Sequence, residues 1–351
     1  MESAIPKNLE CPRTRARRVA DSYVPPYPAY TARALPALER VVMGYFGVQA
    51  SGAEAQLKSQ AALTTIVRGF ADTDGPGHHD LAHFVDAAGY DNRIAIAYWR
   101  DPAAFARWRS HSDGWWQADE RLHEDIGFFR EIISPGVEHF ETLYNSVDRL
   151  EGVGAIMGGV SREIQEHAYW GAARDRIPLA QSDALEPSRP RTMLGNDSAP
   201  PGARVRIAGH EHVTIIRSGQ DWTETDGKER ELYLRQMEPV LREGMEFLRD
   251  QGDKVGCYSN RYMRHIDAAG RPLEKTFGLS HWHSLSNLEA WAESHPTHLA
   301  IFGGFMRMVQ ELEFQLKLRL YHEVSILNVG EQEYEYINCH PATGMMRGIA
   351  I

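Results

Sequence analysis

Two stretches of this sequence predict its fold because they repeat one pattern. Residues 93–108 read RIAIAYWRDPAAFARW, and residues 275–291 read KTFGLSHWHSLSNLEAW. Both contain Trp-x5-(Phe or Leu)-x2-Trp, and the two copies are 183 residues apart: Trp99, Phe105 and Trp108, then Trp282, Leu288 and Trp291. In each copy a strand-like run passes into a segment with helical spacing of its apolar positions. The pattern therefore indicates an internal duplication of a strand and the helix that follows it.

Matching elements flank both copies. They are a β-like run (41–49; 212–220), an amphipathic helix (about 53–70; about 228–250) and, after the duplicated stretch, a further strand (140–143; 322–325). Two such β-α-β-α-β-like units predict an α+β fold. We expect duplicated ferredoxin-like units that form a β-barrel flanked by helices, the dimeric α/β-barrel type.

Two proline-rich stretches divide the chain. Residues 1–35, which contain Val-Pro-Pro-Tyr-Pro, predict an extended N-terminal arm, and such an arm commonly packs on a partner. Residues 181–205 predict an irregular connection. The first ferredoxin-like half is then expected over 36–180 and the second over 206–351.

Composition excludes several classes of partner. A net charge of −10 argues against nucleic acid, because neutralising phosphates needs a basic surface. No run of about 18 apolar residues is present to span a bilayer. Three scattered cysteines, Cys11, Cys257 and Cys339, suit a reducing compartment and form no zinc or disulfide pattern. We therefore expect a cytoplasmic protein with neither a nucleic-acid nor a membrane partner.

Sixteen histidines point to metal or proton chemistry, but several groups of them favour structural roles. His79 and His83 have i,i+4 spacing without the glutamate of a zincin helix. His281 and His283 have the spacing of a His-x-His metal site on a strand, and residues 209–212 are typical of a polar turn. Cys339 could supply a thiolate to haem, although a lone cysteine after a strand is more typical of a core.

A more distinctive group is Ser294-His295-Pro296-Thr297-His298, between two predicted helices. Pro296 suits the first helical position, with Ser294 or His295 as the cap. His298 then shares an apolar face with residues at helical spacing: Phe302, Phe305, Val309, Leu312 and Leu316. The residues alone are compatible with a core histidine bonded to a carbonyl or with a metal ligand. A position in the first helical turn favours the ligand, because the helix dipole disfavours imidazolium.

A second histidine interrupts an apolar strand face. Even positions from 316 to 326 are apolar except His322, whereas the odd positions are mostly polar. A buried neutral imidazole is suited to general acid/base catalysis. A structural core histidine fits this pattern equally well.

Several motifs together resemble the aldoxime dehydratase family. They are SHPTHL (294–299), LYHEVS (320–325), INCHP (337–341), IRSGQDW (216–222), FETLY (140–144), YWGAARDR (169–176) and CPRT from Cys11. They occur in order over roughly residues 1–350. The resemblance is specific because it does not depend on one short motif.

The resemblance implies a cytoplasmic homodimeric lyase that uses haem b, active as Fe(II), to dehydrate aldoximes (R–CH=N–OH) to nitriles. His298 matches the proximal iron ligand, and His322 matches the distal acid/base. Ser218 matches the residue that hydrogen-bonds the oxime hydroxyl. Arg176 matches a distal-pocket arginine, and Glu141 matches a glutamate that assists the proton relay.

Two other functions stay open. One is a haem peroxidase or chlorite-dismutase-like enzyme, which also uses ferredoxin-like halves and histidine-ligated haem. The other is a non-catalytic haem carrier or sensor. Ser218 together with His322 favours the dehydratase, because this pair is suited to an oxime hydroxyl. The preferred aldoxime is undetermined, since residues 181–205 match the family poorly.

Overall fold

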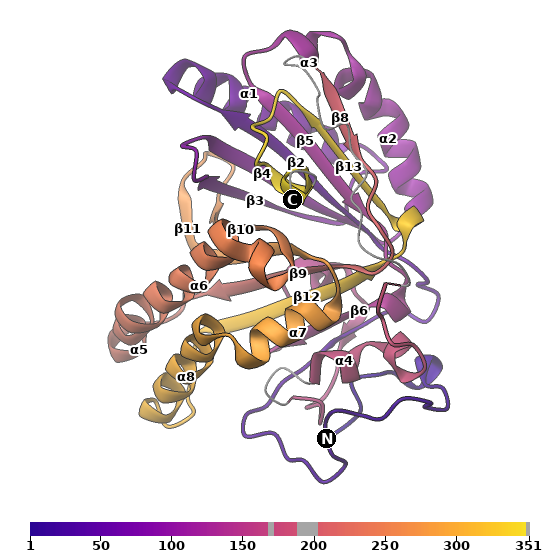
Figure 1. Cartoon of the computed structure of the whole chain (residues 1–351), viewed down its shortest axis with the longest axis vertical. Helices are drawn as coiled ribbons and strands as arrows, with labels where there is room; N and C mark the ends of the chain where they lie inside the picture. Colours follow the sequence, from indigo (N-terminus) through magenta and orange to yellow (C-terminus); the bar gives the residue numbers. More distant parts are fainter. Residues whose placement is uncertain (168–171, 188–202, 349–351) are drawn as a thin grey trace.

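One large antiparallel sheet organises the computed structural model, which describes residues 1–167, 172–187 and 203–348 (Figure 1). Within these ranges eleven strands are ordered β6-β12-β9-β11-β10-β3-β4-β2-β5-β13-β8. The strands are Val42–Ala50 (β2), His78–Val85 (β3), Asp91–Trp99 (β4), Gly127–Ile133 (β5), Phe140–Tyr144 (β6), Arg204–Ile207 (β8), Val213–Asp221 (β9), Cys257–Ile266 (β10), Pro272–Trp282 (β11), Arg319–Leu327 (β12) and Gln332–Ile337 (β13). A separate small pair joins Ala32–Arg33 (β1) to Gly159–Val160 (β7).

Helices cover the outer side of this sheet (Figure 1). They are Ala53–Arg68 (α1), Pro102–Gln117 (α2), Glu120–His123 (α3), Ala172–Arg176 (α4), Gly227–Leu232 (α5), Glu238–Gln251 (α6), Leu285–Ser294 (α7) and Pro296–Glu311 (α8). The helix predicted near 228–250 is interrupted by a π turn at Tyr233–Met237. Pro239 follows this turn, and it has no backbone N–H to donate to the preceding turn of an α-helix.

The duplicated stretches fold as the sequence predicts. Asp101 caps α2 by accepting a hydrogen bond from the Ala103 backbone, and Ser284 caps α7 through the Asn287 backbone. Trp99 and Trp282 end their strands in full burial. Each ring meets a tryptophan of the next helix, at centroid distances of 5.0 Å and 5.6 Å. Both helices therefore fold back onto the strands that precede them.

The two halves contribute blocks with the same neighbour pattern. The first block is β3-β4-β2-β5, and the second is β12-β9-β11-β10. The blocks meet where β10 pairs with β3 through only two residue pairs, Arg264 with His83 and His265 with Ala82. Helices α1 and α2 cover the first block, and α6, α7 and α8 cover the second.

The predicted closed barrel is wrong. Among the described residues, β6 and β8 are the two edges of the sheet and do not pair with each other. The N-terminal arm covers the β6 edge instead, because Tyr30 and Tyr144 exchange two backbone hydrogen bonds of 2.8 Å. An edge that is already occupied cannot pair with β8.

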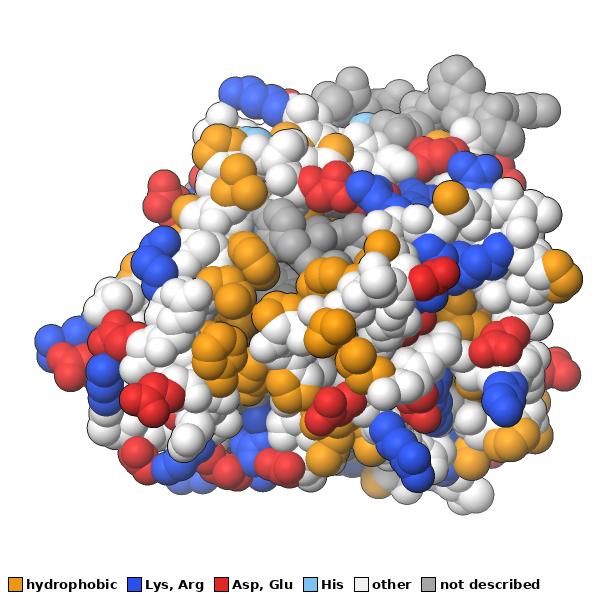
Figure 2. Space-filling view, turned by 90° about the horizontal axis from the view of Figure 1, so that it is seen from below, with side chains coloured by type: hydrophobic (Ala, Val, Ile, Leu, Met, Phe, Trp, Pro, Cys, Tyr) orange, Lys and Arg blue, Asp and Glu red, His pale blue; other side chains and the backbone are white. Residues whose placement is uncertain are grey.

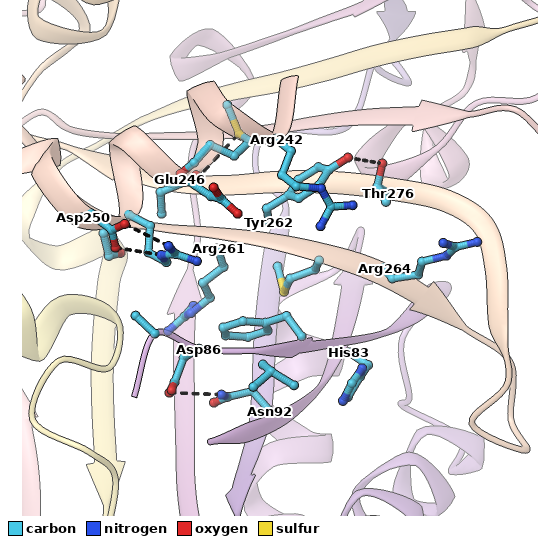
Figure 3. A pocket seen from close by; sticks show the side chains of 18 of the residues that line it. His83, Asp86, Asn92, Arg242, Glu246, Asp250, Arg261, Tyr262, Arg264 and Thr276 are labelled. Carbon is cyan, nitrogen blue, oxygen red and sulfur yellow. Dashed lines mark hydrogen bonds and ion pairs between the residues drawn. The ribbon is translucent and has the colours of Figure 1, made fainter. Parts of the chain in front are cut away.

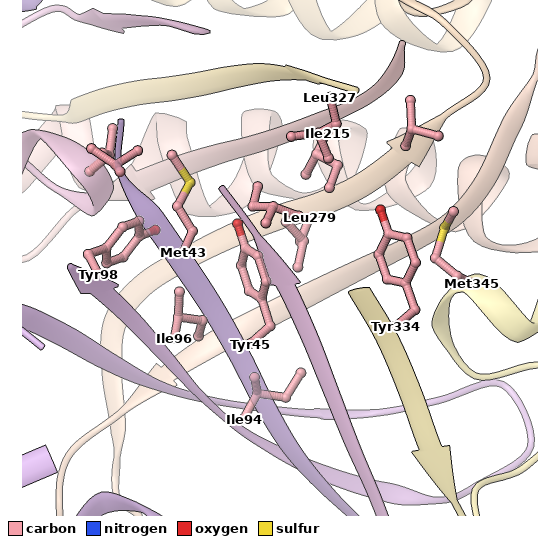
Figure 4. Packing of buried hydrophobic residues seen from close by; sticks show 14 of the residues in the cluster. Met43, Tyr45, Ile94, Ile96, Tyr98, Ile215, Leu279, Leu327, Tyr334 and Met345 are labelled. Atoms are coloured by element: carbon pink, nitrogen blue, oxygen red, sulfur yellow. The ribbon is translucent and has the colours of Figure 1, made fainter. Parts of the chain in front are cut away.

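The open sheet still encloses one core. Its inner face brings together apolar side chains of both blocks, including Ile96 of β4, Ile215 of β9, Leu279 of β11 and Tyr334 of β13 (Figure 4). The sheet therefore curls around a shared interior without closing. The site described below lies on the opposite, outer face of the second block.

The strands and helices also bear on two questions raised by the sequence: whether His79 and His83 can share a metal ion, and whether a helix could span a membrane. His79 and His83 lie on β3, where four residues span about 13 Å, so they cannot share one metal ion. Within the described ranges, no cluster of three or more His, Cys, Asp or Glu side chains is arranged to bind a metal ion. None of the described helices has the length and apolar character needed to cross a membrane.

We predict that Trp99→Ala lowers the free energy of unfolding by about 3–5 kcal/mol, because the buried indole contacts Phe105 and Trp108 and its loss leaves a cavity. Urea unfolding measures this change. Leu57→Ala is the control, since Leu57 is 73% exposed on α1 and its loss should change stability by less than about 0.5 kcal/mol. Equal effects of the two substitutions would contradict this packing.

Candidate active site

A cavity of about 360 Å³ lies between the outer face of the second block and helices α6 and α8. Strands β9, β11 and β12 form one wall, and the N-terminal arm closes one side through Tyr23, Pro26 and Tyr27. Viewed from below, hydrophobic side chains gather near the middle of the molecular surface (Figure 2). A cavity of this size and character is typical of a small-molecule or cofactor site.

The sheet wall places Ser218 and His322 side by side. Ser218 of β9 is the direct cross-strand partner of His322 on β12. Directly opposed residues of an antiparallel pair point to the same face, with Cβ atoms about 4.5–5.5 Å apart. Both side chains line the cavity. Pairing of two strands thus joins residues that are 104 positions apart in the chain.

Glu141 and Arg176 contact His322 at this wall. Glu141 Oε1 lies 2.8 Å from His322 Nε2, and Arg176 binds the Glu141 carboxylate through two nitrogens at 2.7 Å and 3.1 Å. Burial favours the neutral acid, but Arg176 and His322 outweigh it and lower the pKa of Glu141 to about 2. Glu141 is therefore a carboxylate at neutral pH, and it accepts the hydrogen of His322 Nε2. Arg176 also donates to the Glu166 carbonyl at 2.7 Å, which fixes the guanidinium in place.

His298 belongs to the opposite wall. Helix α8 begins at Pro296, and the His295 side chain caps it by accepting from the Thr297 backbone. In the first turn of this helix, the His298 ring lies edge-on to Trp291, with centroids 4.8 Å apart. Burial lowers the pKa of His298 to about 4 despite a hydrogen bond with the Ala292 backbone. The imidazole is therefore neutral at pH 7, the form that binds a metal ion.

The cavity residues fit a haem group. The helical wall offers an apolar surface of Ile301, Phe302 and Phe305 beside the imidazole of His298. Phe302 is 37% exposed, as expected for a wall that receives an apolar ligand. In the part of the chain that the structure describes, the buried Nε1 of Trp291 has no hydrogen-bond partner. A planar apolar ligand with polar edge groups matches this combination.

The other candidate ligands lie elsewhere. His281 is buried in the inner core, 3.2 Å from the Ser259 hydroxyl, and burial lowers its pKa to about 4. Burial raises the pKa of the Cys339 thiol, which lies 3.2 Å from the Phe128 carbonyl. Neither residue lines the cavity between α8 and the sheet. The structure therefore gives no support to a Cys339 thiolate ligand.

A larger cavity of about 960 Å³ lies where the two blocks meet (Figure 3). Side chains of both charges line it, and two of its arginines pair with acidic neighbours: Arg242 with Glu238, and Arg249 with Asp250. None of the five predicted site residues lines it. We therefore place the site in the smaller cavity, where four of the five line the wall and Glu141 contacts His322 directly.

The sequence did not reveal the contribution of the N-terminal arm. The arm packs on its own chain, where Glu166 accepts hydrogen bonds from the Ala4 backbone at 2.9 Å and from Arg17 at 3.0 Å. His167, which also lines the cavity, donates from Nδ1 to the Tyr27 carbonyl at 2.8 Å. Burial lowers the pKa of His167 to about 4. Val-Pro-Pro-Tyr-Pro predicted an extended arm, but no local pattern showed which loop it would contact.

Two predicted segments lie partly outside the described residues. They are residues 169–171 of the YWGAARDR motif and most of the connection 181–205.

Known proteins resemble this chain over its full length. A model of the haem-containing dehydratase family matches residues 44–345. An aliphatic aldoxime dehydratase from Rhodococcus globerulus is 50% identical over 100% of this chain and 99% of its own. A second one, from Pseudomonas chlororaphis, is 49% identical with the same coverage, and a phenylacetaldoxime dehydratase from a Bacillus species is 31% identical over 94% of both chains.

Solved structures give the same result. A crystal structure of an aldoxime dehydratase aligns with a TM-score of 0.94 and 49% identity, over 99% of this chain and 98% of the other. An aldoxime dehydratase in complex with butyraldoxime also aligns with a TM-score of 0.94, over 99% of this chain and 96% of the other. The agreement of family model, sequences and fold confirms the resemblance seen in the motifs. The chain belongs to the aldoxime dehydratases of the haem-containing dehydratase family.

Proposed function

We propose that the chain dehydrates aldoximes to nitriles in the cavity between α8 and the sheet, with His298 as the haem ligand and His322 as the proton-transfer group. One observation carries the assignment of roles. Ser218 and His322 lie side by side on one wall, His298 lies on the facing helix, and Glu141 binds His322.

The reaction requires three actions from the site. Hydroxide is a poor leaving group and the aldoxime C–H is barely acidic, so the oxygen must be protonated, charge on nitrogen stabilised and the carbon proton removed. When bound, ferrous haem supplies an electron-rich iron for the oxime nitrogen, which weakens the N–O bond.

The residues on the sheet wall have separate roles in proton transfer. Glu141 holds the His322 ring through Nε2, so His322 can deliver a proton to the oxime oxygen and then accept the carbon proton. Ser218 hydrogen-bonds the oxime hydroxyl and orients it toward His322. Arg176 fixes the Glu141 carboxylate and adds positive charge to this wall. Water is the leaving group, and the nitrile is the product.

Finer features of the protein follow from the same resemblance. From the resemblance we infer haem b, active as Fe(II), and a homodimer. We also infer a cytoplasmic location, because the described cysteines are free and scattered, as in a reducing compartment. We also infer that residues 36–180 and 206–351 are repeats of one ferredoxin-like unit. The shared strand order of the two blocks and the duplicated tryptophans support this inference. Size-exclusion chromatography with light scattering tests the dimer.

A direct assay tests the function. Purified haem-loaded protein, reduced with dithionite, should form butyronitrile from butyraldoxime and phenylacetonitrile from phenylacetaldoxime. Absence of nitrile from every aldoxime tested would leave a haem carrier or sensor. Turnover of peroxide or chlorite by the ferric protein, without nitrile formation, would support the oxidative alternative.

We predict that His298→Ala loses bound haem, because no other described histidine occupies the helical wall of the cavity. The absorption spectrum of the purified variant, oxidised and then reduced, measures this loss. His295→Asn is the matched control, since it changes the neighbouring histidine but keeps a side chain that can cap α8. Retention of a normal haem spectrum by His298→Ala would refute the ligand assignment.

We predict that His322→Ala keeps haem but lowers kcat by about 10²–10⁴-fold, the usual contribution of a general acid/base. Ser218→Ala should also keep haem and lower kcat by about 100-fold, because the hydroxyl of the substrate loses its orientation. Steady-state kinetics together with absorption spectra measure both effects. Full activity of His322→Ala would remove it from the proton-transfer role.

A further inference from the structure

Two buried, charged residues lie directly behind Ser218 and His322. Arg217 precedes Ser218 on β9, and Glu323 follows His322 on β12. Arg217 and Glu323 are also direct cross-strand partners. Because side chains alternate between faces, this second pair points to the inner core while Ser218 and His322 point to the cavity.

The inner pair is bridged by a residue of the other block. The Tyr98 hydroxyl of β4 donates to Glu323 Oε1 at 2.7 Å and accepts a hydrogen bond from Arg217. Arg217 also donates to Asp80 Oδ2 of β3 at 2.7 Å and lies 4.3 Å from the centre of the Phe277 ring. Tyr98 and Asp80 both belong to the first half of the chain. The cluster therefore ties β9 and β12 to strands on the opposite side of the core.

The glycine-rich segment at 152–159 completes this cluster. The Val153 backbone donates to the second oxygen of Glu323 at 2.7 Å. Gly152 has φ +60°, and a Cβ there would overlap the Glu323 carboxylate. Both oxygens of Glu323 are therefore bound, one by each of two segments of the first half.

We propose that Arg217 and Glu323, bridged by Tyr98, are positioning residues that set the relative placement of Ser218 and His322. The proposal rests on the proposed function of that pair. A buried charge that loses a hydrogen bond must regain a partner, and the backbone that carries it moves to do so. A shift of the backbone at Arg217 or Glu323 also displaces the adjacent residue, Ser218 or His322, on the cavity face.

Tyr98→Phe tests this proposal because it removes only the bridging hydroxyl. We expect haem binding to be unchanged and kcat to fall by about 10–100-fold, since a misplacement of about 1 Å at a reacting pair can cost about 100-fold. KM should change little, because the apolar cavity wall is untouched. The pH profile of kcat should shift, because the 2.8 Å contact between His322 and Glu141 changes when β12 moves.

Tyr336→Phe is the matched control. Tyr336 is a buried tyrosine of the same core whose hydroxyl donates to the Glu131 carboxylate at 2.5 Å, but its strand does not line the cavity. Both variants should lose thermal stability, whereas only Tyr98→Phe should change kcat and the pH profile. Equal kcat values and pH profiles in the two variants would overturn the proposal.

Asp80→Asn provides a second test if Tyr98→Phe does not fold. It keeps the shape of the side chain but removes the charge that pairs with Arg217. We expect a smaller loss of kcat in the same direction, with haem retained. Wild-type kinetics in a folded Asp80→Asn would overturn the proposal even without Tyr98→Phe. Absence of nitrile formation by the wild type would instead overturn the proposed function, and this inference with it.

Discussion

The pairing of β9 with β12 is the constraint on which the site depends. Nine consecutive residue pairs fix its register, from Arg319 with Asp221 to Leu327 with Val213. Since side chains alternate along a strand, this register points Ser218 and His322 toward the cavity and Arg217 and Glu323 toward the core. A slip of one residue would exchange the two faces and destroy both sets of contacts. The chemistry of the cavity and the packing of the interior are therefore set by the same hydrogen-bond ladder.

The interior of the protein carries more charge than an ordinary core. Besides the Arg217 cluster, Arg261 of β10 binds Glu131 of β5 through two hydrogen bonds, at 2.7 Å and 2.6 Å. Isolated buried charges cost several kcal/mol each, so such groups persist only when paired and fully hydrogen-bonded. In both clusters the partners come from different halves of the chain. These ion pairs thus specify how the two blocks face each other. Apolar packing alone would specify this arrangement less selectively.

The N-terminal arm covers one edge of the sheet and supports one side of the cavity. Its pairing with β6 covers an exposed sheet edge, and its contacts with Glu166 and His167 hold the segment that precedes Arg176. Asp175 is anchored in the same way, since it accepts hydrogen bonds from the backbones of Arg18 and Val19 at 2.9 Å and 2.8 Å. An element with almost no secondary structure of its own therefore completes both the sheet and the cavity.

The sequence by itself determined the features that depend on neighbours along the chain. The repeated tryptophan pattern predicted the duplicated strand and helix, and Pro296 with its cap predicted the start of α8 and the place of His298. The period-two pattern on β12 distinguished His322 from its apolar neighbours. The motifs, taken together and in their order along the chain, were enough to indicate the family. These properties follow from local periodicity and capping, which a linear sequence displays directly.

Only the tertiary structure decided which distant groups meet. The contact of His322 with Glu141 joins residues 181 positions apart, and Arg176 reaches both from a short helix. The edge that prevents barrel closure is likewise covered by a segment more than 100 residues away, at Tyr30. Such contacts depend on strand pairing and sheet curvature across the whole fold. No local pattern in the sequence encodes these distances, so the sequence could name candidate site residues but not the geometry in which they meet.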